Sequence, residues 1–183
     1  MLSADPAITS LVITTTSIAA AAGGLSAATF VHLRYKNFDL TMFMNGILGG
    51  LVSITASADQ VSITEAMLIG VIGGVVVVLA VSLLDALRLD DPVGAVAVHL
   101  FTGVWGTLAV GLFGALASWH QFLIQLSGVA IVGVFCVGTT SIMLAIIQRI
   151  WGLRVSKGEE LEGLDQAEHG GMNAYADFRM NQH

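Results

Sequence analysis

His99 is the residue of this chain best suited to chemistry, because it lies inside an apolar run from Pro92 to Ala117 that contains no charged side chain. An ionisable side chain at membrane depth is rare and usually faces a bundle interior or a solvent-filled path. Imidazole can accept and donate hydrogen bonds, and it can relay protons without holding a fixed charge. The position of His99 therefore indicates a transport function.

The spacing along this run predicts which residues share a helix face with His99. At 3.6 residues per turn, one helix face carries Ala95, His99, Thr102, Gly103 and Gly106, which are small or mildly polar. We expect this face to look toward the interior of a bundle. A structural alternative stays open, in which a neutral imidazole donates one hydrogen bond to a carbonyl of a neighbouring helix, because periodicity does not separate the two.

The carboxylates outside this run are explained by helix starts and pairing. Glu65 has the spacing of a capping box with Ser62, and Asp85 is spaced to pair with Arg88 one turn later. A membrane enzyme that combines His99 with a carboxylate is disfavoured, because the available carboxylates lie near helix ends. We expect no enzymatic activity.

We do not expect His32, His120 or Cys136 to form a metal site. His32 belongs to a basic loop and His120 to a helix start, and neither has metal-ligand spacing to another candidate ligand. Cys136 is the only cysteine, so it cannot form an internal disulfide or a thiolate cluster. We expect neither a metal nor a cofactor.

The composition indicates an integral membrane protein. Of 183 residues, 55% are hydrophobic and 11% charged, and the mean hydropathy is +0.83. The net charge of −6 makes nucleic acid an improbable partner. No cleavable signal peptide is expected, because the first residues, Met1 to Asp5, lack a positively charged start.

Five transmembrane helices are predicted in a membrane domain of residues 1–151, followed by a cytoplasmic tail, 152–183. The apolar stretches run about 8–31, 41–58, 63–87, 93–117 and 120–151. Asp5-Pro6 and Asp91-Pro92 each place an N-cap carboxylate before a proline at the first helical position. Ser118 and Gln121 form a second capping-box pattern.

The basic residues predict the orientation. With the N-terminus outside, all seven Lys and Arg residues fall on the inner side of a plasma (inner) membrane, as the positive-inside bias requires, and the C-terminus is cytoplasmic. The last span, Trp119 to Trp151, would measure roughly 50 Å against a hydrocarbon core of about 30 Å, so it must tilt or protrude.

Glycines recur at the spacing of helix contacts, at Gly46 with Gly50, Gly70 with Gly74, and Gly103 with Gly106. Small residues let helix backbones approach closely in lipid, where packing drives association. These helices are predicted to contact other helices, some of them from a second polypeptide.

Several motifs together resemble the ammonium transporter (Amt/Mep/Rh) family. The segment Asp90-Asp91-Pro92-Val93-Gly94-Ala95-Val96-Ala97-Val98-His99, followed by Gly103-Val104-Trp105-Gly106-Thr107, is similar to a helix of that family. Asn45-Gly46 through Thr55 is similar to its Asn-Gly helix. Gly152-Leu153-Arg154-Val155, Glu162-Gly163-Leu164-Asp165, His169-Gly170 and Ala174-Tyr175 are similar to its cytoplasmic tail.

The resemblance implies an all-α transmembrane fold. The family forms trimers of eleven-helix subunits, and this chain would supply the last five helices, including the long tilted final one. Ammonium gives up its proton and crosses a narrow apolar pore beside two hydrogen-bonded histidines. His99 matches the second of these, and Ala95 falls at a pore-lining position. A PII-type signalling protein is the partner implied at the tail.

Two functions follow as hypotheses. In the first, the chain is the C-terminal half of an ammonium transporter, which conducts ammonium or ammonia only with an N-terminal half that supplies the partner histidine. In the second, it is a non-transporting membrane subunit that associates with or regulates full-length transporters through its glycine faces and tail.

Overall fold

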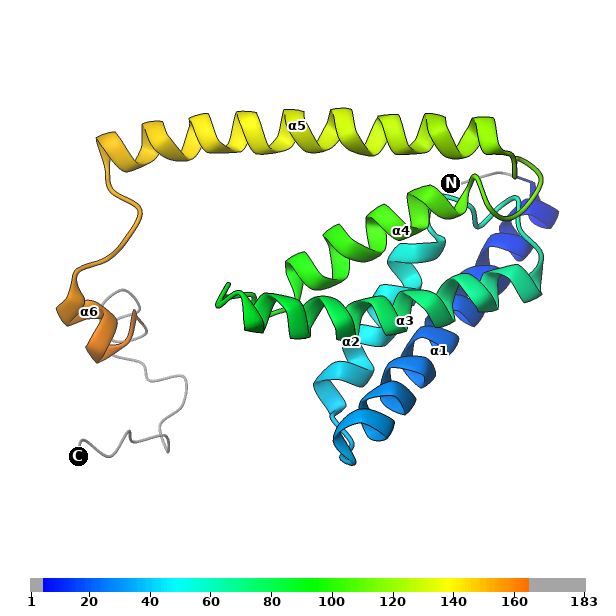
Figure 1. Ribbon diagram of the computed structural model, residues 1–183, viewed down its shortest axis with the longest axis horizontal. Coiled ribbons are helices and arrows are strands. Elements are labelled where there is room, and N and C mark those ends of the chain that lie inside the picture. The colour runs from blue at the N-terminus through cyan, green and yellow to red at the C-terminus, as the bar shows by residue number, and fades with distance from the viewer. Residues whose placement is uncertain (1–4, 165–183) are drawn as a thin grey trace. The chain divides into compact units, whose positions relative to one another are not determined.

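The structure is a computed structural model that describes residues 5–164, and these residues contain helices and no strands. Figure 1 shows their order along the chain. The helices are α1 (Pro6–Tyr35), α2 (Leu40–Ile54), α3 (Ile63–Ala86), the π-helix η1 (Ala95–Phe101), α4 (Thr102–Ala109), α5 (Trp119–Ile150) and α6 (Lys157–Glu162). The tail motifs His169-Gly170 and Ala174-Tyr175 lie outside the described residues.

Three helices, α1, α3 and α5, are long and apolar enough to cross a membrane. The predicted second span is helical over the 15 residues of α2, and the predicted fourth is helical over η1 and α4. Both are shorter apolar helices. Residues 55–58 and 110–117 of the two predicted spans lie in the turns and bends that follow these helices, not in helix.

Two predicted helix starts are confirmed. The carboxylate of Asp5 accepts a hydrogen bond from the Ala7 amide at 2.8 Å, with Pro6 in the first helical position. Glu65 Oε2 accepts from the Ser62 amide at 2.8 Å, while Ser62 Oγ accepts from the Glu65 amide at 3.3 Å. Both motifs satisfy backbone donors locally, which is why sequence identifies them.

Two other predicted starts are wrong in part. The fourth apolar segment begins its helix at Ala95, not at Pro92, and Gly94 is the residue before it. At the start of α5, the Gln121 amide donates to Ser118 Oγ at 3.1 Å, but the Ser118 amide donates to the Gly111 carbonyl at 3.0 Å. The second hydrogen bond of a capping box, from the Ser118 amide to the Gln121 side chain, is therefore replaced by a backbone hydrogen bond within the loop.

Helices α1, α2 and α3 pack against one another through the predicted glycines (Figure 1). A Cβ on Gly50 would lie 2.1 Å from the Ala19 carbonyl oxygen, and one on Gly74 would lie 2.1 Å from that of Gly23. The backbones thus touch at distances that no side chain permits. Thr15 Oγ1 adds a buried hydrogen bond of 2.8 Å to the Ala58 carbonyl.

Helix α4 packs on α2, and η1 packs on α3. A Cβ on Gly106 would lie 2.4 Å from the Ser53 carbonyl oxygen, so this glycine is required at the contact. Gly103 is different, because its nearest neighbour, a methyl of Val52, would lie 3.9 Å from an added Cβ. Of the predicted pair Gly103 and Gly106, Gly106 makes its helix contact within residues 5–164, and a contact at Gly103 stays a prediction.

The structure corrects two further predictions on the predicted inner side. His32 lies in the last turn of α1, not in the loop that follows. Asp85 and Arg88 form no ion pair, because Arg88 adopts a left-handed backbone conformation (φ 56°) and its amide donates to the Asp85 carbonyl at 3.0 Å. This turn ends α3.

The chain divides into two units, residues 1–132 and 133–183, so α5 passes from one into the other. In the second unit, α6 begins with a capping box between Ser156 and Glu159. Arg154 Nη2 lies 2.7 Å from Glu160 Oε1, and this carboxylate raises the pKa of the Arg154 guanidinium. The predicted tail thus begins with its own local structure.

Candidate pore-lining site

The site around His99 starts with a carboxylate below the π-helix. Asp91 Oδ2 accepts hydrogen bonds from the amides of Val96 at 3.1 Å and Ala97 at 2.9 Å. The hydrogen bond from the Ala97 amide lowers the pKa of the Asp91 carboxyl below its ordinary value. Asp91 therefore caps the helix, as predicted for a helix-start residue, but from four residues before its first turn rather than from the position next to it.

Gly94 makes this arrangement possible. It has a left-handed backbone conformation with φ of 70°, and an added Cβ would lie 3.0 Å from Nδ2 of Asn45 on α2. The Gly94 amide donates to the Asp91 carbonyl at 3.1 Å, and its carbonyl accepts from the Val98 amide at 2.7 Å. The resulting turn places the carboxylate under the free amides of η1.

The π-helix changes which residues share a face. A π-helix bonds from residue i to i+5, so its turns are wider than the 3.6 residues that the sequence prediction assumed. Ala97 and Val98 are buried, whereas Ala95 and His99 are exposed. Thr102 and Gly106 are buried in α4, and Thr102 Oγ1 donates to the Val98 carbonyl. Within residues 5–164 the predicted face therefore divides by burial, with Ala95 and His99 exposed and Thr102 and Gly106 buried, and its orientation toward a bundle interior stays a prediction.

The imidazole of His99 forms no hydrogen bond or ion pair with any residue in 5–164. Its neighbours Val96 and Leu100 are 39% and 57% exposed, so the surface around the ring is apolar. The structural alternative required a bond from this ring to a neighbouring helix, and the described helices provide none. The ring lies on a side of η1 that the other helices of this chain leave uncovered.

Trp105 holds α4 behind this surface. Its indole Nε1 donates to the Ile69 carbonyl of α3 at 3.1 Å, and its ring packs edge-on against Phe113 with centroids 6.3 Å apart. Together with the Gly106 contact on Ser53, this bond fixes α4 on α2 and α3. The exposed side of η1 is thereby presented by a braced helix rather than by a loop.

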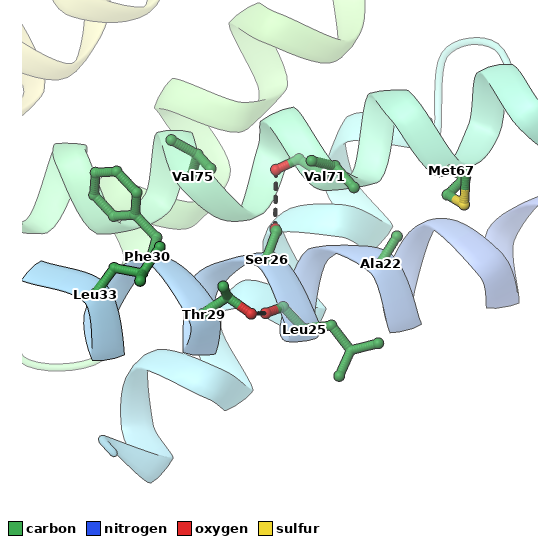
Figure 2. A pocket seen from close by; sticks show the side chains of 9 residues that line it. All are labelled: Ala22, Leu25, Ser26, Thr29, Phe30, Leu33, Met67, Val71 and Val75. Carbon is green, nitrogen blue, oxygen red and sulfur yellow. Dashed lines mark hydrogen bonds between the residues drawn. The ribbon is translucent and has the colours of Figure 1, made fainter. Parts of the chain in front are cut away.

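Apart from this surface, a groove lies between α1 and α3 (Figure 2). This groove has a volume of about 400 Å³ and is lined by Ala22, Leu25, Ser26, Thr29, Phe30, Leu33, Met67, Val71 and Val75. Both hydroxyls are already used, since Ser26 Oγ donates to the Val71 carbonyl at 2.9 Å and Thr29 Oγ1 to that of Leu25 at 2.7 Å. The groove therefore offers mainly apolar contact, and the hydrogens of its two hydroxyls are already engaged. Elsewhere in residues 5–164, no three His, Cys, Asp or Glu side chains gather as a metal site would require.

Comparison with known proteins connects this geometry to a family. Residues 1–175 match the sequence model of the Ammonium Transporter Family. This chain belongs to that family. Ammonium transporter Amt2 of Archaeoglobus fulgidus is 35% identical to it over 97% of the chain and 41% of the relative.

Solved ammonium transporter structures share its fold. A protein titled Sensor Amt Protein matches with a TM-score of 0.84 at 35% identity, over 91% of this chain and 43% of the other. Mep2 of Candida albicans matches with a TM-score of 0.78 at 27% identity, over 83% and 38%. The chain spans about a quarter to two fifths of the length of the curated relatives it matches, so the all-α transporter fold holds for that part.

Sequence reasoning missed two features of this ammonium transporter segment. One is the π-helix, for which the sequence pattern carries no signal, because apolar residues fill either helix type equally well. The other is the reach of Asp91 to the Val96 and Ala97 amides. Here a signal was available, because a glycine three residues after the aspartate permits a turn before the helix begins.

Proposed function

We propose that this chain contributes part of the wall of a conduit for ammonium or ammonia, with His99 as its pore imidazole and Ala95 as a pore-lining residue. The observation that carries the proposal is the exposed ring of His99, which lies in an apolar surface and has no partner among the described residues. Such a surface on a membrane protein is explained when a further protein segment covers it.

The chemistry of the surface suits neutral ammonia. Moving a charged ammonium ion along an apolar path is expensive, whereas ammonia has no net charge to desolvate. Imidazole can accept a hydrogen bond from ammonia at one nitrogen and donate at the other, and it can pass a proton without a permanent charge in the path. Ala95 precedes His99 on the same exposed side and leaves space beside it.

The proposal includes a second polypeptide segment that closes the conduit. His99 is exposed, and it lines neither the groove of Figure 2 nor the pocket beside Asp59 and Gln125. We therefore expect no conduction by this chain alone, and conduction when a segment equivalent to the remaining part of a family member is supplied. Assembly as a trimer and binding of a PII-type protein at the tail stay predictions of the same proposal.

The test is uptake of methylammonium by cells that express the chain alone, the complementary segment alone, or both. We expect uptake only with both, and a changed rate or charge movement per substrate with His99→Ala. His120→Ala is the matched control, because His120 is an exposed histidine at the start of α5. Uptake by the chain alone, or uptake that His99→Ala leaves unaltered, would contradict the proposal. An effect on a co-purifying full-length transporter that survives His99→Ala would instead support the regulatory subunit.

A further inference from the structure

One side chain of α2 lies against the start of the π-helix that carries His99. The atoms nearest to a Cβ added at Gly94 are Nδ2, Cγ and Oδ1 of Asn45, at 3.0, 3.4 and 3.5 Å. The whole carboxamide group of Asn45 therefore covers the Cα of Gly94. Because Gly94 is the left-handed residue from which η1 starts, the contact is made at the turn that leads into this helix.

Helix α2 contacts η1 and α4 through residues four positions apart on one of its faces, namely Asn45, Gly49 and Ser53. A Cβ added at Gly49 would lie 3.4 Å from Cγ2 of Thr102, and one added at Gly106 would lie 2.9 Å from the Cα of Ser53. The backbone of α2 thus approaches α4 directly, whereas the side chain of Asn45 lies between that backbone and Gly94.

Asn45 makes this contact by its size and shape. Its amide forms no hydrogen bond with a residue in the described range 5–164, whereas Ser53 Oγ in the same helix donates to the Gly49 carbonyl at 2.6 Å. Asparagine in a membrane helix often stabilises helix pairs through hydrogen bonds. Since Asn45 forms none with η1, what it contributes to this helix pair is van der Waals contact with Gly94.

Helix α2 is fixed at the point from which Asn45 extends. The next residue is Gly46, where an added Cβ would lie 2.7 Å from the carbonyl oxygen of Gly23, so the backbones of α2 and α1 touch there. Asn45 therefore extends from a backbone that close helix packing holds in place. The position of its carboxamide sets how closely Gly94 can approach α2.

His99 lies between the two ends of this contact. It follows Gly94 by five residues, which is one hydrogen-bonded turn of a π-helix, and it precedes Thr102 by three. We propose that Asn45 is a positioning residue, which holds the first turn of η1 at a set distance from α2 and so determines where the imidazole of His99 lies. Its importance for conduction rests on the proposed function of His99, whereas its effect on the position of η1 does not.

The first test is nuclear magnetic resonance of the full chain in nanodiscs with isotopically labelled histidine, where His99→Ala assigns the ring signals of His99. Asn45→Ala removes the carboxamide and should shift these signals. Asn45→Leu keeps the branched shape of the side chain without its polar atoms, and it should return the signals toward their wild-type positions. Met44→Ala is the matched control, because Met44 is 56% exposed on the same helix and should leave them unchanged.

The second test is a double-mutant cycle on methylammonium uptake, with the complementary segment supplied and the rate normalised to the amount of chain in the membrane. Asn45→Ala should lower the maximal rate roughly threefold or more, and Asn45→Leu should restore most of it. In the His99→Ala background, Asn45→Ala should have no further effect, because the residue acts through that imidazole. A general loss of stability would lower the rate in both backgrounds.

The outcomes separate this role from the conduit. If no combination gives uptake but Asn45→Ala shifts the ring signals of His99 and Asn45→Leu restores them, the conduit is wrong and the positioning of η1 stands. Unshifted ring signals in Asn45→Ala, equal shifts in Met44→Ala, or equal losses of rate in both backgrounds would each overturn the inference. Asn45→Leu that behaves like Asn45→Ala would overturn it as well, because hydrogen bonding by the amide would then be the property required.

Discussion

The indole Nε1 of Trp105 donates a hydrogen bond of 3.1 Å to the carbonyl of Ile69, thirty-six positions earlier in the chain. This bond joins α4 to α3 and so braces the helix that follows the π-turn of His99. The Ile69 carbonyl also lies within α3, where it belongs to the helix ladder, so the indole is a second donor to that oxygen. This side-chain hydrogen bond adds to the backbone contact of Gly106 with Ser53 in holding the proposed pore wall.

Replacing this indole should loosen α4. We expect Trp105→Phe to lower the free energy of unfolding by about 1 kcal/mol, through loss of the hydrogen bond with most of the apolar contact kept. Far-UV circular dichroism during denaturant unfolding in detergent measures the change. Trp119→Phe is the control, because Trp119 is 71% exposed and should shift stability little. Equal effects of the two substitutions would argue against a specific role for the Ile69 contact.

Gly106 and Gly128 provide a matched pair of helical glycines. An added Cβ at Gly106 would lie 2.4 Å from the Ser53 carbonyl oxygen, whereas one at Gly128 would meet nothing within 4 Å. We expect Gly106→Ala to destabilise the protein by ~1–3 kcal/mol through overpacking of the α2–α4 contact. Gly128→Ala should be neutral or slightly stabilising, by up to about 1 kcal/mol, because alanine has the higher helix propensity. Thermal unfolding measures the stability of the two variants, and equal stability would argue against the close contact of Gly106 with the Ser53 carbonyl.

Asp91 should make stability depend on pH in the acid range. Its carboxyl pKa is lowered in the folded chain by hydrogen bonds from backbone amides, that of Ala97 foremost. A group with a lowered folded pKa stabilises the fold above its unfolded value, near 3.9, and that stabilisation is lost as pH falls through the folded value. The difference in stability between wild type and Asp91→Asn should thus be constant at neutral pH and shrink below about pH 4.

Asp90→Asn is the control for Asp91, because Asp90 is exposed and accepts no hydrogen bond within residues 5–164. It should unfold like the wild type at every pH. If Asp91→Asn also matches the wild type at neutral pH, the carboxylate does not stabilise the start of η1. Nuclear magnetic resonance of the Val96 and Ala97 amides gives an independent measure, since both signals should shift when Asp91 titrates.

Glu65 should control the opening of the loop between α4 and α5. Its two carboxylate oxygens hold the Ser62 amide and the Gly114 amide at once, at 2.8 and 3.1 Å. Glu65→Ala removes both bonds, and we expect roughly tenfold or faster hydrogen exchange at Gly114. Ser62→Ala removes the hydroxyl of the capping box and leaves the Gly114 bond, so it should raise exchange at Glu65 and leave Gly114 protected. Fast exchange at Gly114 in the wild type would contradict this role.

Local motifs were predictable from sequence because their partners lie within a few residues. The caps at Asp5 and at Ser62 with Glu65 are of this kind, since each satisfies free amides of the turn that follows it. The apolar runs likewise identified the helices and the membrane character, and the Asp90–His99 segment indicated the family before any comparison. Composition and short-range hydrogen bonding are properties that a linear chain already carries.

Only the tertiary structure decided the facing of His99, the separation of Asp85 from Arg88, and the joining of Trp105 to Ile69. The first depends on a π-turn, which the same apolar residues fill as readily as an α-turn, and around it Ala95 and His99 are exposed whereas Thr102 is buried. The others depend on how chain segments meet across dozens of positions, and a contact between distant residues is determined by packing of whole helices rather than by the sequence around either partner.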